Sequence, residues 1–163
     1  MRTRILLATL ASLLIQHDAT TANRCFMHGS VKEEFKIATA VFSGKVISEE
    51  YRRVTLPPGD QREGSEVLIV KLSVDRYWKG NGDSEVEMYT TVTKLPGGLI
   101  QSYAEDFHFE LGEYYLIYAY GPPDKLRTDV CKRTAKVEQA KEDLRKLGKG
   151  KVPKGTERQS FPN

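Results

Sequence analysis

Two cysteines that lie far apart in an exported chain constrain the fold of this protein more than any other feature of its sequence. The first 22 residues begin with two arginines, continue with the apolar run 5–15 and end in small residues. That order is typical of a secretory signal peptide, and the run is shorter than the about 20 residues that span a bilayer. We therefore expect cleavage after Ala22, a mature chain that starts at Asn23, and a secreted, extracellular protein.

Cys25 and Cys131 are the only cysteines of the sequence. In an oxidising compartment, two cysteines in one chain favour a disulfide between them. The bond would close a loop of about 100 residues, which contributes roughly 4–5 kcal/mol in the chain-entropy model. It would also tie the mature N-terminus to the body of the fold, either as a structural staple alone or as the support of an exposed amino terminus.

Charge divides the mature chain into a slightly acidic body and a basic end. The 141 residues after the signal carry a net charge of +2, to which residues 145–163 contribute +5 and residues 23–144 contribute −3. A nucleic-acid partner needs a basic face on the folded body, so we expect none. No second long apolar segment is present, so we also expect no membrane span. The predicted organisation is a signal peptide at 1–22, one domain at 23–148 and a basic disordered tail at 149–163.

The pattern of apolar residues predicts an all-β domain with a helix at each end. Ser30 and Glu33 have the spacing of a capping box, which predicts a short helix at 30–38. Runs rich in β-branched and aromatic residues predict five strands, at 40–47, 67–74 with a continuation toward 78, 84–92, 112–120 and 126–131. Gly44 predicts a bulge or a bend in the first strand. Residues 49–65 are polar and contain prolines, and they predict a long loop.

The closing helix is predicted at 134–147 and is ended by Gly148. Four apolar residues recur on one of its faces at helical spacing, namely Val137, Ala140, Leu144 and Leu147. Five strands joined by short connections fit a small closed barrel such as the OB-fold, and the pattern leaves a β-sandwich open.

Tyrosines gather on the strand predicted at 112–120. Four of them, Tyr114, Tyr115, Tyr118 and Tyr120, are candidates for a surface on which nucleic-acid bases stack. Strict alternation instead places Tyr114, Leu116, Tyr118 and Tyr120 on one face of the strand. We interpret that face as part of the core of the barrel.

Few side chains suggest chemistry of their own. His28 and His108 are the mature histidines, and neither belongs to a zinc-binding motif. Acidic residues surround the start of the tyrosine-rich strand, and we expect a solvated rim from Glu105, Asp106, Glu110 and Glu113. Nucleophile and phosphate-loop motifs are missing from the sequence. We therefore expect no enzyme, no cofactor and no metal bound by the chain itself.

Five short motifs in a fixed order resemble one known family. They are Cys25 near the mature start, AVFSGKV at 40–46, YWKG at 77–80, FELGEYYLIY at 109–118 and TDVCKRT at 128–134. This order is similar to that of the tissue inhibitor of metalloproteinases family, which contains a netrin-like module. The resemblance covers most of residues 23–147. It implies a five-stranded OB-fold barrel with flanking helices.

The cysteines depart from the pattern of that family, which opens with Cys-X-Cys. The second family cysteine matches Cys25, and its usual partner matches Cys131. The first falls at Asn23, and its usual partner falls near Glu105 and Asp106. Both halves of that second disulfide are missing together, which supports the pairing of Cys25 with Cys131.

The resemblance implies inhibition of secreted or matrix zinc metalloproteases through the mature N-terminus. Family members place the α-amino nitrogen and carbonyl oxygen of their first residue on the catalytic zinc, and Asn23 has both atoms. Catalytic zinc keeps a position open for such a ligand, and an α-amine with a pKa of about 7.7–8.0 is readily deprotonated. Arg24 would then point into the specificity pocket, which suits a long cation badly.

Two alternatives remain open at this stage. Asn23 and Arg24 can form a frayed terminus without a role. The domain can also be a netrin-like module that binds another extracellular protein or the extracellular matrix without inhibiting a protease. A free mature N-terminus distinguishes the classes, because only the inhibitor requires it.

Overall fold

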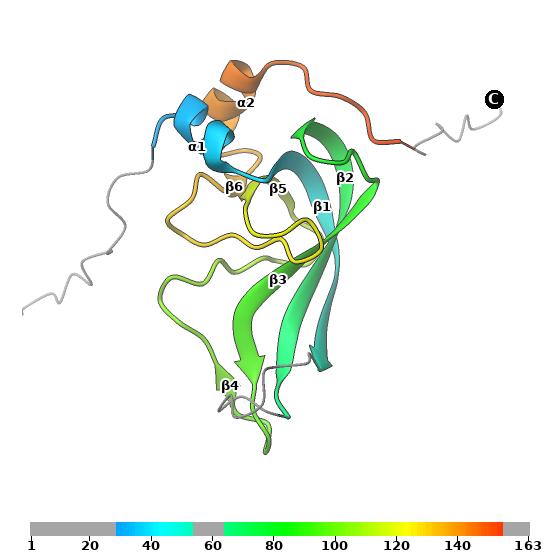
Figure 1. The fold of residues 1–163 in the computed structure, drawn as a ribbon, viewed down its shortest axis with the longest axis vertical. Coiled ribbons are helices and arrows are strands. Elements are labelled where there is room, and N and C mark those ends of the chain that lie inside the picture. The colour runs from blue at the N-terminus through cyan, green and yellow to red at the C-terminus, as the bar shows by residue number, and fades with distance from the viewer. Residues whose placement is uncertain (1–28, 54–63, 155–163) are drawn as a thin grey trace, which may run out of the picture.

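The computed structural model describes residues 29–53 and 64–154, whose backbone is mostly β (Figure 1). The elements follow in the order α1 (Val31–Ile37), β1 (Ala40–Arg53), β2 (Glu66–Lys79), β3 (Glu85–Lys94), β4 (Ile100–Gln101), β5 (Tyr114–Ala119), β6 (Ala135–Lys136) and α2 (Lys141–Leu147). Six strands form one sheet in the order β4-β3-β2-β1-β5-β6, and every neighbouring pair is antiparallel. The sheet curls into a half-barrel, and both helices lie at one end of it. The predicted all-β class with two helices is confirmed at this level.

The capping box predicted for the first helix is present. The Ser30 hydroxyl accepts a hydrogen bond from the Glu33 amide at 3.3 Å, and the Glu33 carboxylate accepts one from the Ser30 amide at 2.7 Å. These bonds satisfy amides at the helix start that have no partner within the helix. Val31 and Ala38 are buried and Phe35 is half-buried, so these apolar residues form the inner face of α1 and its C-cap.

β1 is longer than the sequence suggested, and the predicted loop at 49–65 is wrong for its first residues. Residues 49–53 pair with β2 throughout, up to Arg53 opposite Glu66. The polar side chains of this stretch face solvent, where one face of an antiparallel sheet can stay polar. Residues 54–63 of the predicted loop lie outside the described residues.

The bulge or bend predicted at Gly44 is present as a break in the strand pairing. The pairing of β1 with β2 shifts register between Ser43 and Gly44. A Cβ atom on Gly44 would lie 2.4 Å from the carbonyl oxygen of Ser73, so only glycine allows the strands to approach this closely.

The fifth strand predicted at 126–131 is wrong as an element. Leu126 forms a parallel bridge with Met88 and Arg127 an antiparallel bridge with Tyr120, and the chain then turns at Asp129. The two bridges nevertheless connect β3 to the end of β5 across the open side of the half-barrel. The sequence analysis did not find β4, which has only two residues and therefore shows no periodicity.

The closing helix begins at Lys141, so the prediction of a helix from residue 134 is wrong for its first half. Residues 135–136 pair with Tyr115 and Leu116 as β6, and a turn leads from there into α2. Ala140 is buried, and Leu144 and Leu147 pack beside it.

β5 is buried on both faces. Tyr115 and Ile117 belong to the larger core cluster inside the half-barrel, whereas Leu116 and Tyr118 belong to a second cluster beneath the helices. Tyr114, predicted on the core face, is 46 % exposed, so that prediction is wrong for this residue.

The chain after α2 lies against the end of β2. The indole nitrogen of Trp78 donates to the carbonyl of Gly148 at 3.0 Å, and the backbones of Tyr77 and Lys151 exchange hydrogen bonds at 2.9 and 2.8 Å. Lys154, within the segment predicted as a disordered tail, donates to Gly82 at 2.9 Å. Residues 155–163 lie outside the described residues. Within residues 29–53 and 64–154 no helix is long and apolar enough to cross a membrane.

Candidate functional site

Most residues of the predicted inhibitory site precede the described part of the chain. The signal peptide and the residues Asn23, Arg24, Cys25 and His28 all lie outside the described residues. Cys131 lies inside them, in the turn that connects the bridges at 126–127 to β6. The structure therefore describes the surroundings of Cys131 and of Gly29, the first described residue.

Cys131 is held in place by Asp129. The Cys131 amide donates to the Asp129 carboxylate at 2.8 Å, and the Tyr120 hydroxyl donates to the other oxygen of the same carboxylate. The predicted pairing with Cys25 stays a prediction, and Cys131 is not a free thiol. The partly buried Asp129 carboxylate accepts both hydrogen bonds and so fixes the backbone at this point of the turn.

The segment at 105–106 lies beside the Cys131 turn. The Val130 amide donates to the carbonyl of Glu105 at 3.0 Å, and Asp106 forms a bridge with Asp129. Asp106 is 6 % exposed, and its carboxylate accepts hydrogen bonds from the Thr91 hydroxyl and, at 2.6 Å, from the Tyr103 amide. The predicted solvated rim is therefore wrong for Asp106, which is a buried structural carboxylate.

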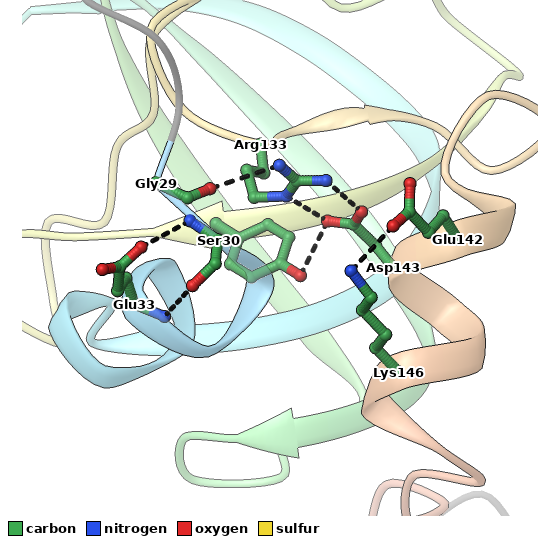
Figure 2. A network of polar contacts seen from close by, with 8 residues as sticks. Gly29, Ser30, Glu33, Arg133, Glu142, Asp143 and Lys146 are labelled. Carbon is green, nitrogen blue, oxygen red and sulfur yellow. Dashed lines mark hydrogen bonds and ion pairs between the residues drawn. The ribbon is translucent and has the colours of Figure 1, made fainter.

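Arg133 connects the first described residue to the closing helix (Figure 2). Its guanidinium binds the Asp143 carboxylate through two nitrogens, at 2.7 and 2.5 Å, and donates to the carbonyl of Gly29 at 3.2 Å. The Tyr118 hydroxyl donates to Asp143 at 2.9 Å. The buried Asp143 carboxylate thus holds Arg133 and Tyr118, and Arg133 in turn binds the carbonyl of Gly29.

The charges of this network are stabilised by one another. Burial by itself raises the pKa of Asp143, but the hydrogen bonds from Arg133 and Tyr118 and the charge of Arg133 outweigh it, so that the pKa lies below its ordinary value. Burial raises the pKa of Tyr118, and the hydrogen bond to Asp143 and its charge raise it further. The hydrogen bond to Asp143 raises the pKa of Arg133. Asp143 is therefore ionised and Tyr118 is neutral at physiological pH.

Local bonds orient the residues of the network. The Tyr118 amide donates to the hydroxyl of Thr134 at 3.0 Å, and the Thr128 hydroxyl donates to the Tyr118 carbonyl at 3.1 Å. These bonds tie both ends of the Cys131 turn to β5. α2 supplies Asp143 from its first turn, where a carboxylate also interacts favourably with the helix dipole.

The sequence analysis missed Arg133 and Asp143. A signal for Asp143 was present, because it falls three residues after Ala140 and four before Leu147, on the apolar side of the helix. A charged residue at such a position needs a buried partner. The sequence does not identify Arg133 as that partner, because only the turn before α2 brings Arg133 to Asp143.

The other predicted site residues do not form a cluster. Glu110 and Glu113 are exposed, as expected of a rim, and both bind Lys136, at 3.0 and 3.6 Å. His108 is exposed beside Phe107 and Phe109. No group of three or more metal-ligating side chains occurs within residues 29–53 and 64–154.

The tyrosines of β5 do not form a stacking surface. Tyr115 and Tyr118 are each 1 % exposed, so bases cannot reach their rings. Tyr115 instead packs edge to face against Phe107 and Phe109, with ring centroids 5.7 and 5.1 Å apart. The interpretation of Tyr118 as a core residue is confirmed, and Tyr115, which strict alternation placed on the opposite face, is buried as well.

Comparison with known proteins identifies no family for this chain. The sequence matches no protein-family model, and it matches no curated protein. What the protein does must therefore be inferred from the order of its motifs and from the residues around Cys131.

Proposed function

We propose that this protein is a secreted inhibitor of zinc metalloendopeptidases, similar to the tissue inhibitors of metalloproteinases, and that it acts through its mature N-terminus. After removal of residues 1–22, the α-amino nitrogen and the carbonyl oxygen of Asn23 would occupy the open position of the catalytic zinc in the target enzyme. Arg24 would be directed into the specificity pocket of that enzyme. The chain itself would supply no metal and no catalytic group.

The observation that carries this proposal is the contact between Gly29 and Arg133. Gly29 follows Cys25 by four residues, and Arg133 follows Cys131 by two, so the 3.2 Å hydrogen bond places Gly29 beside the turn that holds Cys131. Four residues span at most about 14 Å. A disulfide with the usual Cα separation of about 5.5–6 Å is therefore within reach of Cys25.

A second observation supports the resemblance. In the family, two cysteines separated by one residue pair with two later cysteines, so those two later positions must lie close together. The corresponding positions here are near Asp106 and at Cys131, and the backbones of Glu105 and Val130 are joined by a 3.0 Å hydrogen bond. The geometry required for the family pattern is thus available, although this chain carries only one of the two cysteine pairs.

We also propose that the half-barrel is an OB-fold barrel. The bridges of Leu126 with Met88 and of Arg127 with Tyr120 connect β3 to β5, and β5 pairs with β1. Together with β2 this makes a ring of five segments, which is the number in the partly open OB barrel. The assignment agrees with the fold implied by the resemblance.

The mechanism depends on how firmly Asn23 is held. The predicted disulfide at Cys25 and the hydrogen bond at Gly29 would fix the chain two and six residues beyond Asn23. The family has a disulfide at the first residue itself, so Asn23 should be less preorganised and should bind zinc more weakly. In this mechanism the chain would position its terminal amine through these two anchors, and the target enzyme would supply the metal.

A free α-amine at Asn23 is the decisive test. The mature protein would be assayed against a panel of secreted zinc endopeptidases, beside a form with one alanine added before Asn23. N-terminal sequencing of the secreted protein would first establish where the signal is cleaved. We expect the mature form to inhibit at least one enzyme and the extended form to inhibit none, because the extension moves the amine away from the metal. Equal inhibition by both forms would contradict the mechanism.

Two substitutions separate the parts of the proposal. Arg24→Thr should tighten inhibition, since it removes a long cation from an apolar pocket. Arg133→Gln should weaken inhibition by releasing Gly29, whereas Arg145→Gln, on the exposed side of α2, should leave it unchanged. If no enzyme of the panel is inhibited by any form, the netrin-like binding module becomes the better proposal.

A further inference from the structure

A cavity of about 270 Å³ opens at the end of the half-barrel near the β2–β3 turn, and the proposed inhibition does not use it. Its walls come from the start of β1, the end of β2, the turn at 80–83, the start of β3 and the loop at 123–126. Figure 1 shows the β2–β3 turn at the same end of the sheet as the start of β1. The volume lies just below the about 300–1,000 Å³ of typical ligand sites, so the cavity fits a small molecule.

The floor of the cavity is apolar and belongs to the larger core cluster. Ala40, Phe42, Val74 and Leu126 line it, and all four are buried members of that cluster. Val86 and the ring of Tyr77 complete the lining and are partly buried. An aromatic or branched aliphatic group placed here would be removed from water and would contact Phe42 and Tyr77.

The turn at 80–83, which closes the cavity, packs closely against the ring of Tyr77. Gly82 has a φ of +75° and is buried, and a Cβ atom at this position would lie 2.7 Å from the Tyr77 ring. Gly80 has a φ of +114°, and its Cβ atom would lie 3.1 Å from that of Ala40. Both glycines let the turn approach the lining side chains closely, so this wall of the cavity is preformed.

The charge at the rim selects the polar part of the ligand. Lys79 donates two of its three ammonium protons to the carbonyls of Phe35 and Lys36, at 3.0 Å each, so its charge is directed to the end of α1. Glu87 is bound to Arg52 by two hydrogen bonds of 2.9 Å, and Glu85 is bound to Lys71.

Two carboxylates at the rim remain without such a partner. Asp83 and Asp124 are exposed, and neither forms an ion pair with any residue in the described part of the chain. The rim therefore favours a positive charge above an apolar floor.

We propose that this cavity binds a small organic cation, with an aromatic or branched aliphatic group on the apolar floor and a protonated amine at the rim beside Asp83 and Asp124. The apolar floor supplies most of the affinity, and the two carboxylates discriminate against anions of the same shape. The ligand site is separate from the N-terminus, so it exists whether or not the protein inhibits a protease.

The test uses 2-phenylethylamine as the probe and 3-phenylpropionate as its anionic counterpart. Each would be titrated at equal ionic strength into the isotope-labelled mature protein, and amide chemical shifts would be followed by NMR. We expect saturable shifts at Gly80, Gly82 and Leu126 for the amine and binding at least tenfold weaker for the carboxylate. Equal binding of both probes, shifts outside the cavity, or no saturation by the amine at millimolar concentration would overturn the proposal.

Substitutions then identify the two parts of the site. Asp83→Asn and Asp124→Asn should each weaken amine binding about two- to fivefold, as expected for an exposed charge, whereas Asp75→Asn on the exposed side of β2 should not change it. Val86→Phe should abolish binding by filling the cavity. Urea unfolding checks that this variant is folded, and the double Asp83→Asn, Asp124→Asn variant decides the question if it is not. Amine binding that is indifferent to both aspartates would refute the role of the rim.

Discussion

Replacing the buried Asp143 by alanine should strongly destabilise this fold. Asp143 is 4 % exposed and accepts three hydrogen bonds, two from Arg133 and one from Tyr118 (Figure 2). The substitution leaves the Arg133 charge and the Tyr118 hydroxyl without their acceptor. Removing one partner of a buried ion pair costs about 3–5 kcal/mol. Because the Arg133 side chain is 24 % exposed and water can reach it, we expect the lower end, about 3 kcal/mol.

Urea unfolding of the mature protein measures this loss. With a slope of about 1.5 kcal/mol per M, a loss of 3 kcal/mol lowers the unfolding midpoint by about 2 M. Glu142→Gln is the matched control, since Glu142 is the neighbouring residue of α2 and its 2.7 Å pair with Lys146 is exposed. An exposed pair of this spacing contributes little to stability, so the unfolding midpoint of this variant should hardly change.

The reasoning is refuted if Asp143→Ala costs no more than Glu142→Gln. A double-mutant cycle with Arg133→Ala gives a second check. The double variant should lose less stability than the sum of the two single variants, because either one already breaks the pair. Additive losses would mean that Arg133 and Asp143 do not interact in solution.

Three further predictions concern the pH dependence, the bulge and the disulfide. The pKa of Asp143 in the folded protein lies below its ordinary value of 3.8, so the stability that Asp143 contributes is present above about pH 4 and is lost as the pH falls through that lowered pKa. The free energy of unfolding should therefore decline less steeply in acid for Asp143→Asn than for the unchanged protein, and an equal slope would contradict this. Gly44→Ala should cost about 1–3 kcal/mol through the overlap with Ser73, well above the effect of Ser48→Ala on the exposed side of β1, and similar unfolding midpoints for the two variants would argue against a close approach. Thiol labelling of the native secreted protein should detect no reactive cysteine, whereas two labelled cysteines or a disulfide-linked dimer would rule out the Cys25–Cys131 bond.

The part of the candidate site that could be predicted is the part with a local cause. The capping box of Ser30 and Glu33 depends on residues three apart, so its pattern is visible in the sequence. The role of Arg133 depends on Gly29 and Asp143, which lie 104 and 10 residues away. These contacts of Arg133 follow from the tertiary path of the chain, and no short-range spacing in the sequence predicts them.

The same distinction explains which strands were misjudged. β2, β3 and β5 have enough β-branched and aromatic residues for their pattern to predict them, with ends that differ by a few residues. Residues 49–53 are mostly polar and became strand because β2 offers a continuous row of backbone partners. Residues 135–136 belong to a helical sequence pattern, but they form β6 because their backbone pairs with the edge of β5. In both cases pairing with a distant strand outweighed local preference.

By itself, the sequence determined the β class of the domain, the start of α1, the bulge at Gly44 and the apolar face of α2. Each of these follows from residue type and short-range spacing, which act before any distant contact forms. Only the tertiary structure decided that Tyr115 and Tyr118 are buried on opposite faces of β5, that Arg133 binds both Asp143 and Gly29, and that a cavity remains beside the β2–β3 turn. These features depend on how the sheet curls and on which distant segments it brings into contact. That arrangement is set by many long-range contacts acting together, which short-range sequence patterns do not reveal.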